Sequence, residues 1–497
     1  MSTSTLSGRD IIIVGAGVAG LSTALYLAKS SDVHVTVLDY QPYLQNGYSP
    51  ANGCDAASAD INKIMRASYG KETDYQRLAY RARDVWVQWN RDLAATPAEE
   101  LPPALTPNTQ IFVPCGFIRL TGDVSIPLNY DELTGLETLT PEQRDKNYIL
   151  KSEQDRARAR EHGGSDRWRN KTSGLTNFYR CDGILDMTAG YTVADKACAY
   201  AQFLCQKAGV KFVFGGNEGR VVKLVVEGEG GSRKVIGVET KDGKTHSGGM
   251  VIVACGGWTA GLVPEVADRL EATAGSVVLV QLPPKEDRPD LWDKYSPERF
   301  AVWSKGFKDV SGPIGNIYGF PTTENGILKI GYRGLKWTNF AEHPLAPGLR
   351  ISVPKTKFTA QKETRIPLVA AEVIKHTIKA LFPDLIGSSK IVATRLCWYC
   401  DSLDNNFLVD YVPGYNESLF VVSGGSGHMF KFLPVLGENV LDVLLHKDTV
   451  YTKMWKWPKP EKTTISWIEK SNGLEEGELG PRVLRKLVMA ETDDLTY

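Results

Sequence analysis

The chain has 497 residues, 42% of them hydrophobic and 23% charged, which suits a globular protein with a sizeable buried core. Its 58 basic and 58 acidic side chains cancel, so nothing draws it to nucleic acid or to an anionic membrane surface. The eight cysteines are few and scattered, which argues against a disulfide framework. Cys397 and Cys400 form a lone C-x-x-C, and because no second pair or histidine lies nearby, we predict no metal site.

The ends of the chain carry no targeting pattern. The N-terminus MSTSTLSGRD lacks a secretory signal, the C-terminus DDLTY is not a peroxisomal tripeptide, and no apolar run is long enough to span a bilayer. We therefore expect a cytoplasmic protein with no membrane or nucleic-acid partner. Length alone suggests roughly two to four domains, although an insertion-rich two-domain enzyme fits equally well.

Residues 11–39 have the strand–turn–helix–strand order of a dinucleotide-binding site. Residues 11–14 predict a buried strand, residues 21–27 an apolar helix and residues 33–38 a second strand. The G-x-G-x-x-G motif between the first strand and the helix consists of Gly15, Ala16, Gly17, Val18, Ala19 and Gly20. Its glycines let the backbone approach a pyrophosphate, and the start of the helix offers free N–H groups to it.

Asp39 follows the second strand, where its carboxylate can accept hydrogen bonds from both hydroxyls of a ribose. A carboxylate at this place disfavours the 2′-phosphate of NADP, so FAD and NAD both remain open. The position of the motif near the start of the chain favours FAD.

The next segment, residues 40–70, is polar, rich in Gly, Asn and Ser, and carries Lys63 and Arg66. Two interpretations are open: a solvated loop with scattered charge, or a loop folded over a cofactor with one cation aimed at a substrate anion. Further along we predict a helix at 74–90, a strand at 111–120, a charged exposed region at 129–172, a helix at 190–208 and strands at 210–215, 221–228 and 234–243. A buried strand at 250–254 runs into a glycine-rich junction, which either packs against the same nucleotide or is an ordinary helix cap.

The segment 276–332 is rich in predicted strands, and one of them contains Lys329 between Leu328 and Ile330. Alternation places Lys329 on the opposite, solvated face, whereas an inward position would lower its pKa and suggest chemistry. A helix at 363–382 ends at Pro383. A strand at 419–422, a glycine-rich turn and a helix at 434–445 make a second place where free N–H groups can face a cofactor. The tail beyond Trp457 is expected to be peripheral.

Nine stretches together resemble the FAD-dependent amine oxidases of the sarcosine oxidase type, which include pipecolate, saccharopine and fructosyl-amino-acid (Amadori) oxidases. They are GAGVAG at 15–20, NKIMRASYG at 62–70, ACGGW at 254–258, YGFP at 318–321, LKIGY at 328–332, ISVPKT at 351–356, RLCWYCDSLDNNFLVDYVP at 395–413, GGSGHMFKFLPVLGENV at 424–440 and MWKWP at 454–458. The last of these is similar to the tail of fungal members.

The resemblance implies an α/β fold with two parts. A discontinuous FAD-binding Rossmann-type domain would comprise residues 1–100, 182–262 and 391–458. An α+β substrate (cap) domain with a mixed, largely antiparallel sheet would comprise residues 101–181 and 263–390. Residues 459–497 would form a peripheral C-terminal tail.

The resemblance also assigns roles to single residues. Cys397 is expected to carry the flavin through a thioether to its 8α carbon, and Lys329 to face the flavin and assist its reaction with oxygen, which replaces the solvated interpretation. Lys431 and Arg66 would share the substrate carboxylate. Tyr318 and Tyr399 would line the substrate cavity, and Lys63 would lie near the flavin. The other residues expected at the cofactor are Gly256, Trp258, Gly425, Gly427, His428 and Phe430, together with Lys431.

The predicted activity is oxidation of a C–N bond in a secondary amine or N-substituted amino acid, with FAD as cofactor and oxygen as acceptor, giving an imine and hydrogen peroxide. Saccharopine, pipecolate or an N-methyl amino acid is the favoured substrate type, with fructosyl amino acids as the alternative. Cys400, Leu403, Met429 and Arg333 depart from the common family motifs, which leaves the substrate open.

Two hypotheses come from other classes. One is a non-catalytic flavin-binding redox sensor that uses Cys397 and Cys400. The other is an NAD-linked dehydrogenase. We expect a small-molecule amine or amino acid and oxygen as partners, and a monomer.

Overall fold

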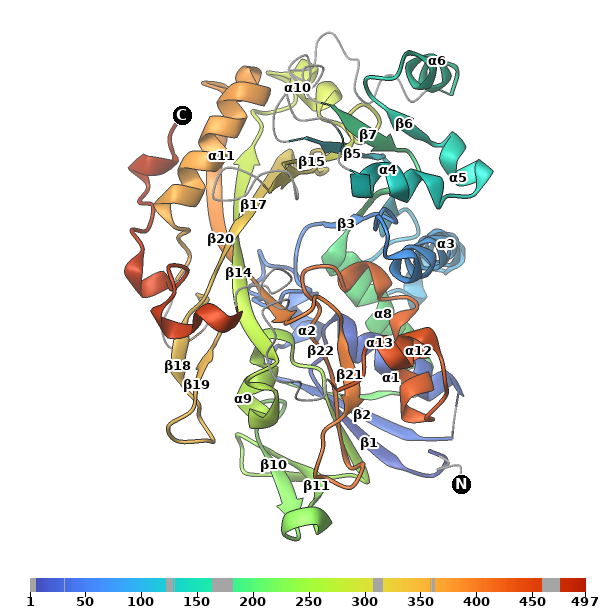
Figure 1. Ribbon diagram of the computed structural model, residues 1–497, viewed down its shortest axis with the longest axis vertical. Coiled ribbons are helices and arrows are strands. Elements are labelled where there is room, and N and C mark those ends of the chain that lie inside the picture. Colours follow the sequence, from blue (N-terminus) through green and yellow to red (C-terminus); the bar gives the residue numbers. More distant parts are fainter. Residues whose placement is uncertain are drawn as a thin grey trace.

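The computed structural model describes residues 6–30, 32–121, 128, 130–162, 182–306, 316–357, 359, 363–457 and 474–497. Two large β-sheets organise them. One is mostly parallel and contains the two strands that flank the glycine motif and its helix. The other is long and strongly twisted and lies beside the first (Figure 1). Of the described helices, none is both long and apolar enough to cross a membrane.

The first sheet has six strands in the order β21-β22-β13-β1-β2-β9. Their bounds are β1 (Asp10–Val14), β2 (His34–Asp39), β9 (Lys211–Phe214), β13 (Met250–Val253), β21 (Leu408–Tyr411) and β22 (Leu419–Ser423). All neighbouring pairs are parallel except β21 with β22. The carboxyl ends of β1, β2, β13 and β22 therefore lie at one edge of the sheet, the edge where open α/β sheets bind ligands.

Alternation along β1 explains how this sheet is covered on both faces. Ile11 and Ile13 pack into the core beneath the helices α1 (Val18–Ser30), α3 (Thr73–Ala95), α8 (Ala194–Lys207) and α12 (Leu436–Leu444). Ile12 and Val14 pack on the other face, against a three-stranded sheet of β10 (Val221–Glu227), β11 (Lys234–Thr240) and β12 (Thr245–Ser247). The first strand is thus buried on both faces, as its continuous apolar run predicts.

The second sheet has eight strands in the order β20-β14-β17-β16-β15-β5-β7-β6. Their bounds are β5 (Phe117–Leu120), β6 (Asn147–Ile149), β7 (Gly183–Asp186), β14 (Leu270–Gln281), β15 (Val302–Lys305), β16 (Ile317–Gly319), β17 (Ile327–Trp337) and β20 (Lys390–Ser402). All pairs are antiparallel except β15 with β5, which confirms the mixed, largely antiparallel sheet. The helix α11 (Leu368–Leu381) covers the outer face of its longest strands (Figure 1).

Shorter elements complete the described part of the chain. They are α2 (Tyr43–Asn46), β3 (Lys63–Met65), β4 (Phe112–Val113), α4 (Tyr130–Glu137), α5 (Pro141–Asp145), α6 (Glu153–Glu161), β8 (Gly190–Thr192), α9 (Thr259–Leu262), α10 (Pro289–Lys294), β18 (Phe340–Glu342), β19 (Arg350–Ser352) and α13 (Val450–Met454). The charged region predicted at 129–172 contains α6. Residues 163–172 of that region lie outside the described part of the chain.

Three predicted elements differ from the structure. The strand at 111–120 is divided into β4 and β5 by Pro114 and by Gly116, whose φ of +84° turns the chain. The helix predicted at 190–208 begins only at Ala194, after the short strand β8. The helix predicted at 363–382 begins at Leu368, because Pro367 stands at its N-cap and its backbone is extended.

The predicted division into domains stays a prediction, but two strands bear on its boundaries. Both β7 and β20 belong to the eight-stranded sheet, although they lie in ranges that the sequence assigned to the FAD-binding domain. The described part of the tail lies on the outer side of that sheet (Figure 1). Its Arg482 is buried and forms an ion pair with Glu271 at 3.1 Å, so the tail also contributes to the interior.

Candidate active site

The glycine motif lies where β1 meets α1, in close contact with the end of β13. A Cβ atom on Gly15, whose φ is +105°, would lie 2.5 Å from the carbonyl oxygen of Ala254. A Cβ atom on Gly20 would lie 1.8 Å from the carbonyl oxygen of Gly15. Only glycine allows the backbone to pack this tightly, so the start of α1 is pressed against the turn as a dinucleotide site requires.

Asp39 ends β2 and lies beside this turn, as predicted. Its carboxylate accepts hydrogen bonds from the N–H groups of Ala16 at 2.8 Å and Gln41 at 2.9 Å. Burial raises the pKa of Asp39 to about 6. A ligand hydroxyl that donates to this carboxylate would offset part of that burial.

The junction after β13 lies at the same edge of the sheet. Gly256 to Trp258 form a 3-10 turn at the carboxyl end of the strand. The ring of Trp258 lies 6.3 Å from that of Tyr40, the residue after Asp39. This second junction therefore adjoins the first, in agreement with the interpretation that both face one nucleotide.

The loop after Asp39 is not a solvated loop. Ser58, Asp60 and Asn62 are all buried. Ser58 Oγ accepts the N–H of Val18 in the first turn of α1 at 2.9 Å. Arg395 of β20 donates to the carbonyl oxygens of Ala59 at 2.6 Å and of residue 56 at 2.9 Å. The loop therefore runs from the glycine motif to the eight-stranded sheet and is fixed at both ends.

Alternation decides which face of the eight-stranded sheet carries the site. Leu328, Ile330, Leu396 and Trp398 point into the core under α11. The residues between them point to the opposite face: Lys329, Gly331 and Arg333 of β17, and Arg395, Cys397 and Tyr399 of β20. Lys329 does lie opposite Leu328, as alternation predicts, but the solvated interpretation of that face is wrong because Lys329 is only 1% exposed.

Lys329 and Lys63 share one carboxylate. Asp60 Oδ2 accepts from the Nζ of Lys329 and from the Nζ of Lys63, each at 2.6 Å, and Lys63 also donates to Cys397 Sγ at 3.6 Å. Burial lowers the pKa of Lys329 to about 8, although Asp60 opposes the shift. Burial would also lower the pKa of Lys63, but Asp60 outweighs it and raises that pKa. Burial alone would raise the pKa of Asp60, and the two ammonium groups reverse this and hold it well below its usual value.

Lys431 is held by a hydrogen-bonded chain that starts on the glycine-rich turn after β22. His428 Nε2 lies 3.0 Å from the carbonyl oxygen of Asn405 and therefore carries the proton, so Nδ1 accepts from the Tyr69 hydroxyl at 3.0 Å. Lys431 Nζ in turn donates to Tyr69 Oη at 2.9 Å and to the carbonyl oxygen of His428 at 3.0 Å. Burial and the charge of Lys431 lower the pKa of His428 well below its ordinary value, so the imidazole is neutral. Two of the three Lys431 donors are thus used, and one is left for a ligand.

Arg66 approaches the same tyrosine. Its Cζ lies 4.8 Å from the centre of the Tyr69 ring, and Lys431 Nζ lies 5.1 Å from that centre. Arg66 also donates to the carbonyl oxygen of Ser68. Burial and the nearby arginines lower the pKa of Lys431 well below its usual value, and a carboxylate bound beside it would raise the pKa again and favour the charged form. The two cations predicted to share a carboxylate are therefore brought together by Tyr69.

Tyr318 and Tyr399 lie over glycines of the sheet. A Cβ on Gly331 would lie 2.3 Å from Tyr318 Cζ, and a Cβ on Gly275 would lie 2.8 Å from Tyr399 Oη. The two rings thus lie close to the strand backbone and cover it on the face that carries Lys329 and Cys397. Burial raises the pKa of Tyr318 to about 12 and that of Tyr399 well above its ordinary value, so both phenols are neutral.

A family model described as FAD dependent oxidoreductase matches residues 10–442 of the chain. The chain belongs to this family. The protein is therefore an FAD-dependent oxidoreductase.

Three similar proteins span nearly the whole chain. L-saccharopine oxidase of Schizosaccharomyces pombe is 24% identical over 503 residues, which cover 98% of this chain and 99% of that protein. N-methyl-L-tryptophan oxidase of Salmonella enteritidis is 24% identical over 448 residues, covering 89% and 96%. The structure of fructosyl peptide oxidase from E. terrenum superimposes with a TM-score of 0.74 at 23% identity and covers 98% of this chain and 99% of that one, which confirms the fold.

The residues present fit FAD. The glycine motif forms a cradle that a Cβ would fill, and Asn62 supplies a second observation at the other end of the loop. Asn62 is 0% exposed, yet neither its amide nitrogen nor its amide oxygen has a hydrogen-bond partner among the described residues. Because buried amides are nearly always paired, these two atoms indicate a ligand with both donors and acceptors. Such groups line the pyrimidine edge of a flavin.

The predicted FAD contacts lie at three places. Gly15 to Gly20 and Asp39 surround the first turn, and Gly256 and Trp258 lie beside it. Lys63 and Cys397 meet at the sheet face. Gly425, Gly427, His428, Phe430 and Lys431 all belong to the turn after β22, where residues 430–432 form a 3-10 turn.

Three side chains of the site, and the loop contacts of a fourth, are not predicted by the sequence patterns. Asp60 joins the two lysines, Asn62 has an unpaired amide, Tyr69 joins Arg66 to Lys431, and Arg395 fixes the loop. Asp60 had one signal, its i to i+3 spacing from Lys63, but the pairing with Lys329 spans 269 positions and leaves no local pattern.

The C-x-x-C pair does not form a disulfide in this fold. Cys397 and Cys400 both lie in the extended strand β20, where three residues at about 3.3 Å each separate their Cα atoms by ~10 Å. A disulfide requires a Cα separation below about 7 Å. Cys400 Sγ also points to the other face, 3.1 Å from Ser423 Oγ. The hypothesis of a redox sensor built on this pair is therefore not supported.

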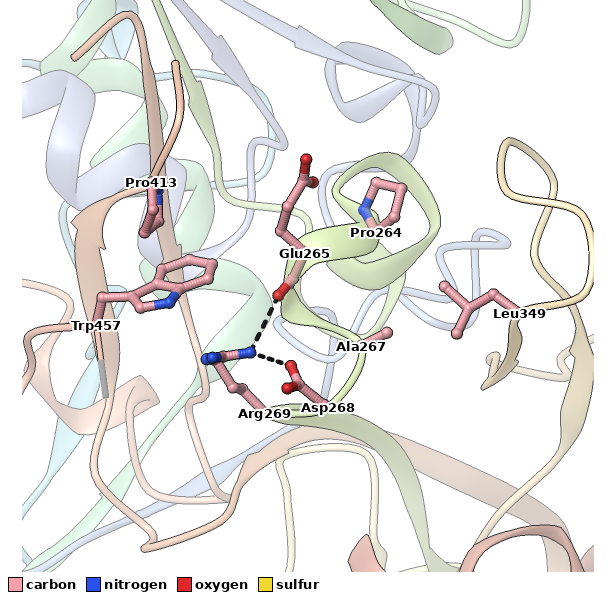
Figure 2. A pocket seen from close by; sticks show the side chains of 8 residues that line it. All are labelled: Pro264, Glu265, Ala267, Asp268, Arg269, Leu349, Pro413 and Trp457. Carbon is pink, nitrogen blue, oxygen red and sulfur yellow. Dashed lines mark hydrogen bonds and ion pairs between the residues drawn. The ribbon is translucent and has the colours of Figure 1, made fainter. Parts of the chain in front are cut away.

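A surface cavity of about 530 Å³ lies away from these residues. Figure 2 shows Glu265, Arg269, Pro413 and Trp457 among the side chains that line it, with Arg269 bonded to the Glu265 carbonyl oxygen at 3.4 Å and to Asp268. None of the predicted site residues lines it. It is therefore distinct from the candidate active site.

Proposed function

We propose that this protein is an FAD-dependent oxidase of secondary amines that carry a carboxylate, of the N-substituted amino acid type. The observation that carries the proposal is a pair of cationic side chains at Tyr69: the half-buried Arg66 guanidinium lies over its ring, and the buried Lys431 Nζ donates to its hydroxyl. Among the described residues neither forms an ion pair with a carboxylate. Unpaired buried charges are costly, so their arrangement favours an anionic ligand.

The relatives support the reaction class. Those that resemble this chain over most of its length are named for oxidation of saccharopine and of N-methyl-L-tryptophan, two secondary amino acids. The overall reaction would remove one C–H hydrogen and one N–H hydrogen from the amine and transfer two electrons and two protons to oxygen. The products would be an imine, which hydrolyses or cyclises, and hydrogen peroxide.

The chain's own residues would bind and orient the substrate. Arg66 and Lys431 would hold the carboxylate, and a carboxylate fixed at two points leaves the adjacent C–H bond little freedom to rotate away. Tyr318 and Tyr399 would cover the sheet face and exclude water from it. Bound FAD would accept the hydride and deliver the electrons to oxygen.

Lys329 would supply positive charge at the cofactor. Its ammonium is fixed by Asp60 and by the carbonyl oxygen of Asn62 at 2.8 Å, so it needs no reorganisation when negative charge develops beside it. With a pKa of about 8, the group is mostly protonated at neutral pH. A fixed charge of this kind is suited to the step in which electrons reach oxygen.

We also propose that Cys397 attaches the FAD covalently through its 8α carbon. The new C–S bond replaces the S–H bond of the thiol and one C–H bond of the flavin methyl group. The two electrons released pass to oxygen, the acceptor of the proposed reaction. The hydrogen bond from Lys63 to the sulfur supports this role, because it stabilises negative charge on sulfur during bond formation.

The test is anaerobic bleaching of the flavin absorbance of the purified protein. The panel would contain sarcosine, N-methyl amino acids, L-pipecolate, L-saccharopine and fructosyl-lysine. Bleaching by an amino acid of the first four kinds, reversed by air with release of peroxide, would support the proposal. Bleaching by fructosyl-lysine alone would select the alternative substrate class, and a flavin that no secondary amine bleaches would overturn the proposal. The expected monomer remains a prediction, which light scattering of the same sample would test.

A further inference from the structure

The cation pair that the proposed function uses is part of a larger set. Arg333 follows Gly331 on the site face of β17, and its guanidinium lies over the Tyr399 ring with Cζ 5.0 Å from the ring centre. From the proposed function we infer that the candidate active site accepts a substrate with two carboxylates. Arg66 and Lys431 would hold one of them, and Arg333 would bind the other.

Arg333 and Lys431 reach the same turn. A Cβ on Gly427 would lie 2.5 Å from the Arg333 Nη2 atom, so the guanidinium rests directly on the backbone of Gly427. The next residue, His428, gives its carbonyl oxygen to Lys431 Nζ at 3.0 Å. Gly427 has a φ of +71°, and glycine is required there both by the backbone conformation and by the arginine. The structure thus makes room for a third cation beside the first two.

The charges of this group are not balanced by the protein. No carboxylate in the described ranges forms an ion pair with Arg66, Arg333 or Lys431. The two acids whose charges act on the arginines have partners of their own: Glu132 pairs with Arg119 at 2.9 Å, and Asp401 pairs with Lys336. Three basic side chains therefore lie near one another around Tyr69 and Gly427 with no ion-pair partner among the described residues.

One carboxylate accounts for two of these charges. Its two oxygens can accept from Lys431 and from Arg66 at the same time, because both cations lie against Tyr69. Arg333 instead rests on the backbone of Gly427 and lies over the Tyr399 ring. A carboxylate bound between Arg66 and Lys431 alone would leave the half-buried Arg333 without a counter-charge, which is unfavourable.

The substrate class follows from this count. A secondary amino acid whose N-substituent or side chain ends in a second carboxylate would pair with all three cations. An N-methyl amino acid with a neutral side chain would pair with only two. A sugar hydroxyl, as in a fructosyl amino acid, would leave Arg333 without a counter-charge.

A binding experiment on the holoenzyme separates this inference from the proposed function, because it requires no turnover. Two acids would be titrated while the flavin absorbance is recorded. They are glutarate, a dicarboxylate, and butyrate, a monocarboxylate with one carbon fewer. We expect glutarate to bind at least 10-fold more tightly than butyrate. In Arg333→Gln, we expect glutarate affinity to fall about 10- to 100-fold while butyrate affinity stays within about threefold. Arg333→Lys, which retains the charge, should recover part of the preference.

A matched control is available in Arg233, whose guanidinium also lies over a tyrosine ring, with Cζ 4.3 Å from the centre of the Tyr415 ring. Arg233→Gln should leave both affinities unchanged. Equal binding of the two acids by the wild type would overturn the inference. So would an Arg333→Gln variant that keeps the glutarate preference but shifts the flavin spectrum, because Arg333 would then act on the cofactor. If Arg333→Gln fails to retain flavin, Arg333→Lys decides. Its preference for glutarate over butyrate, and for glutarate over the longer dicarboxylate adipate, would be compared with that of the wild type. If both preferences are unchanged, the role of Arg333 is overturned.

The two failures are distinguishable. If no amine is oxidised but glutarate binding depends on Arg333, the proposed oxidase function fails while the two-anion site stands. If secondary amino acids are oxidised but dicarboxylates show no advantage, the oxidase function stands and the two-anion site fails.

Discussion

The Nζ atom of Lys329 lies 2.6 Å from Oδ2 of Asp60, and both side chains are almost fully buried. The two residues are 269 positions apart, and the contact joins the loop after β2 to the beginning of β17. Because Lys63 binds the same oxygen, Asp60 is the only counter-charge among the described residues that forms an ion pair with either lysine. We therefore expect this carboxylate to contribute to stability and to the proposed reaction.

Replacing Asp60 with Asn should strongly destabilise the protein. The change leaves two ammonium groups without their shared counter-charge, and breaking a buried pair in this way costs about 3–5 kcal/mol. The urea midpoint of the holoenzyme measures the effect. Asp84→Asn, which removes an exposed pair with Arg83, should change that midpoint little. A loss below about 1 kcal/mol for Asp60→Asn would show that the lysines do not need this carboxylate.

The rate at which oxygen reoxidises the reduced enzyme should depend on the protonation of Lys329. Its pKa of about 8 lies below the usual value for lysine, so the group is charged below pH 8 and loses its charge as the pH rises through 8. We expect a rate that is constant at lower pH and falls above pH 8, measured by stopped-flow mixing with oxygen.

Lys329→Met should slow that step about 100- to 1,000-fold, the usual effect of removing a fixed electrostatic group, and should abolish the pH dependence. Lys294→Met provides the control, because Lys294 is also buried and paired, with Asp384, but lies on the α10 side of the sheet. A pH profile that persists unchanged in Lys329→Met would assign the titration to another group.

Local patterns made much of the fold predictable. The apolar run of β1, the spacing of its glycines and the acid at the end of β2 all lie within 30 residues, so the sequence carries them directly. Alternation correctly placed Lys329 opposite Leu328 and Ile330. It failed only for the environment of that face, because burial there comes from Asp60 and Asn62 on a distant loop.

The candidate site was less accessible to such reasoning. Arg66 and Lys431 were paired by resemblance to a family, since nothing in their local sequence links residues so far apart. Tyr69, which brings them together, had no distinguishing pattern beyond its place in the NKIMRASYG stretch. Arg333 appeared only as a departure from the family motif, and its contact with Gly427 depends on the packing of β17 against the turn after β22.

Arg66→Met should raise KM for a carboxylate substrate about 10- to 100-fold, because a hydrogen bond to a charged group contributes about 1.5–3 kcal/mol. The value of kcat should change less, since the chemistry takes place away from the carboxylate. Steady-state kinetics with the substrate found by the bleaching panel measures both. Arg77→Met, at an exposed pair with Asp74 in the first turns of α3, serves as control. An unchanged KM would remove Arg66 from the carboxylate site.

Cys397→Ser should release the flavin from the protein. A hydroxyl at this position is a weaker nucleophile than a thiol and would not form the proposed bond, so acid precipitation should leave the flavin in the supernatant rather than in the pellet. Cys400→Ser is a closely matched control, because Cys400 lies three residues further along the same strand and points to Ser423 on the other face. It should leave the flavin in the pellet, as in the wild type. If the flavin of Cys397→Ser remained with the precipitated protein, the covalent bond would lie at another residue, and the contact between Lys63 and Cys397 would have to serve the noncovalent packing of the cofactor instead.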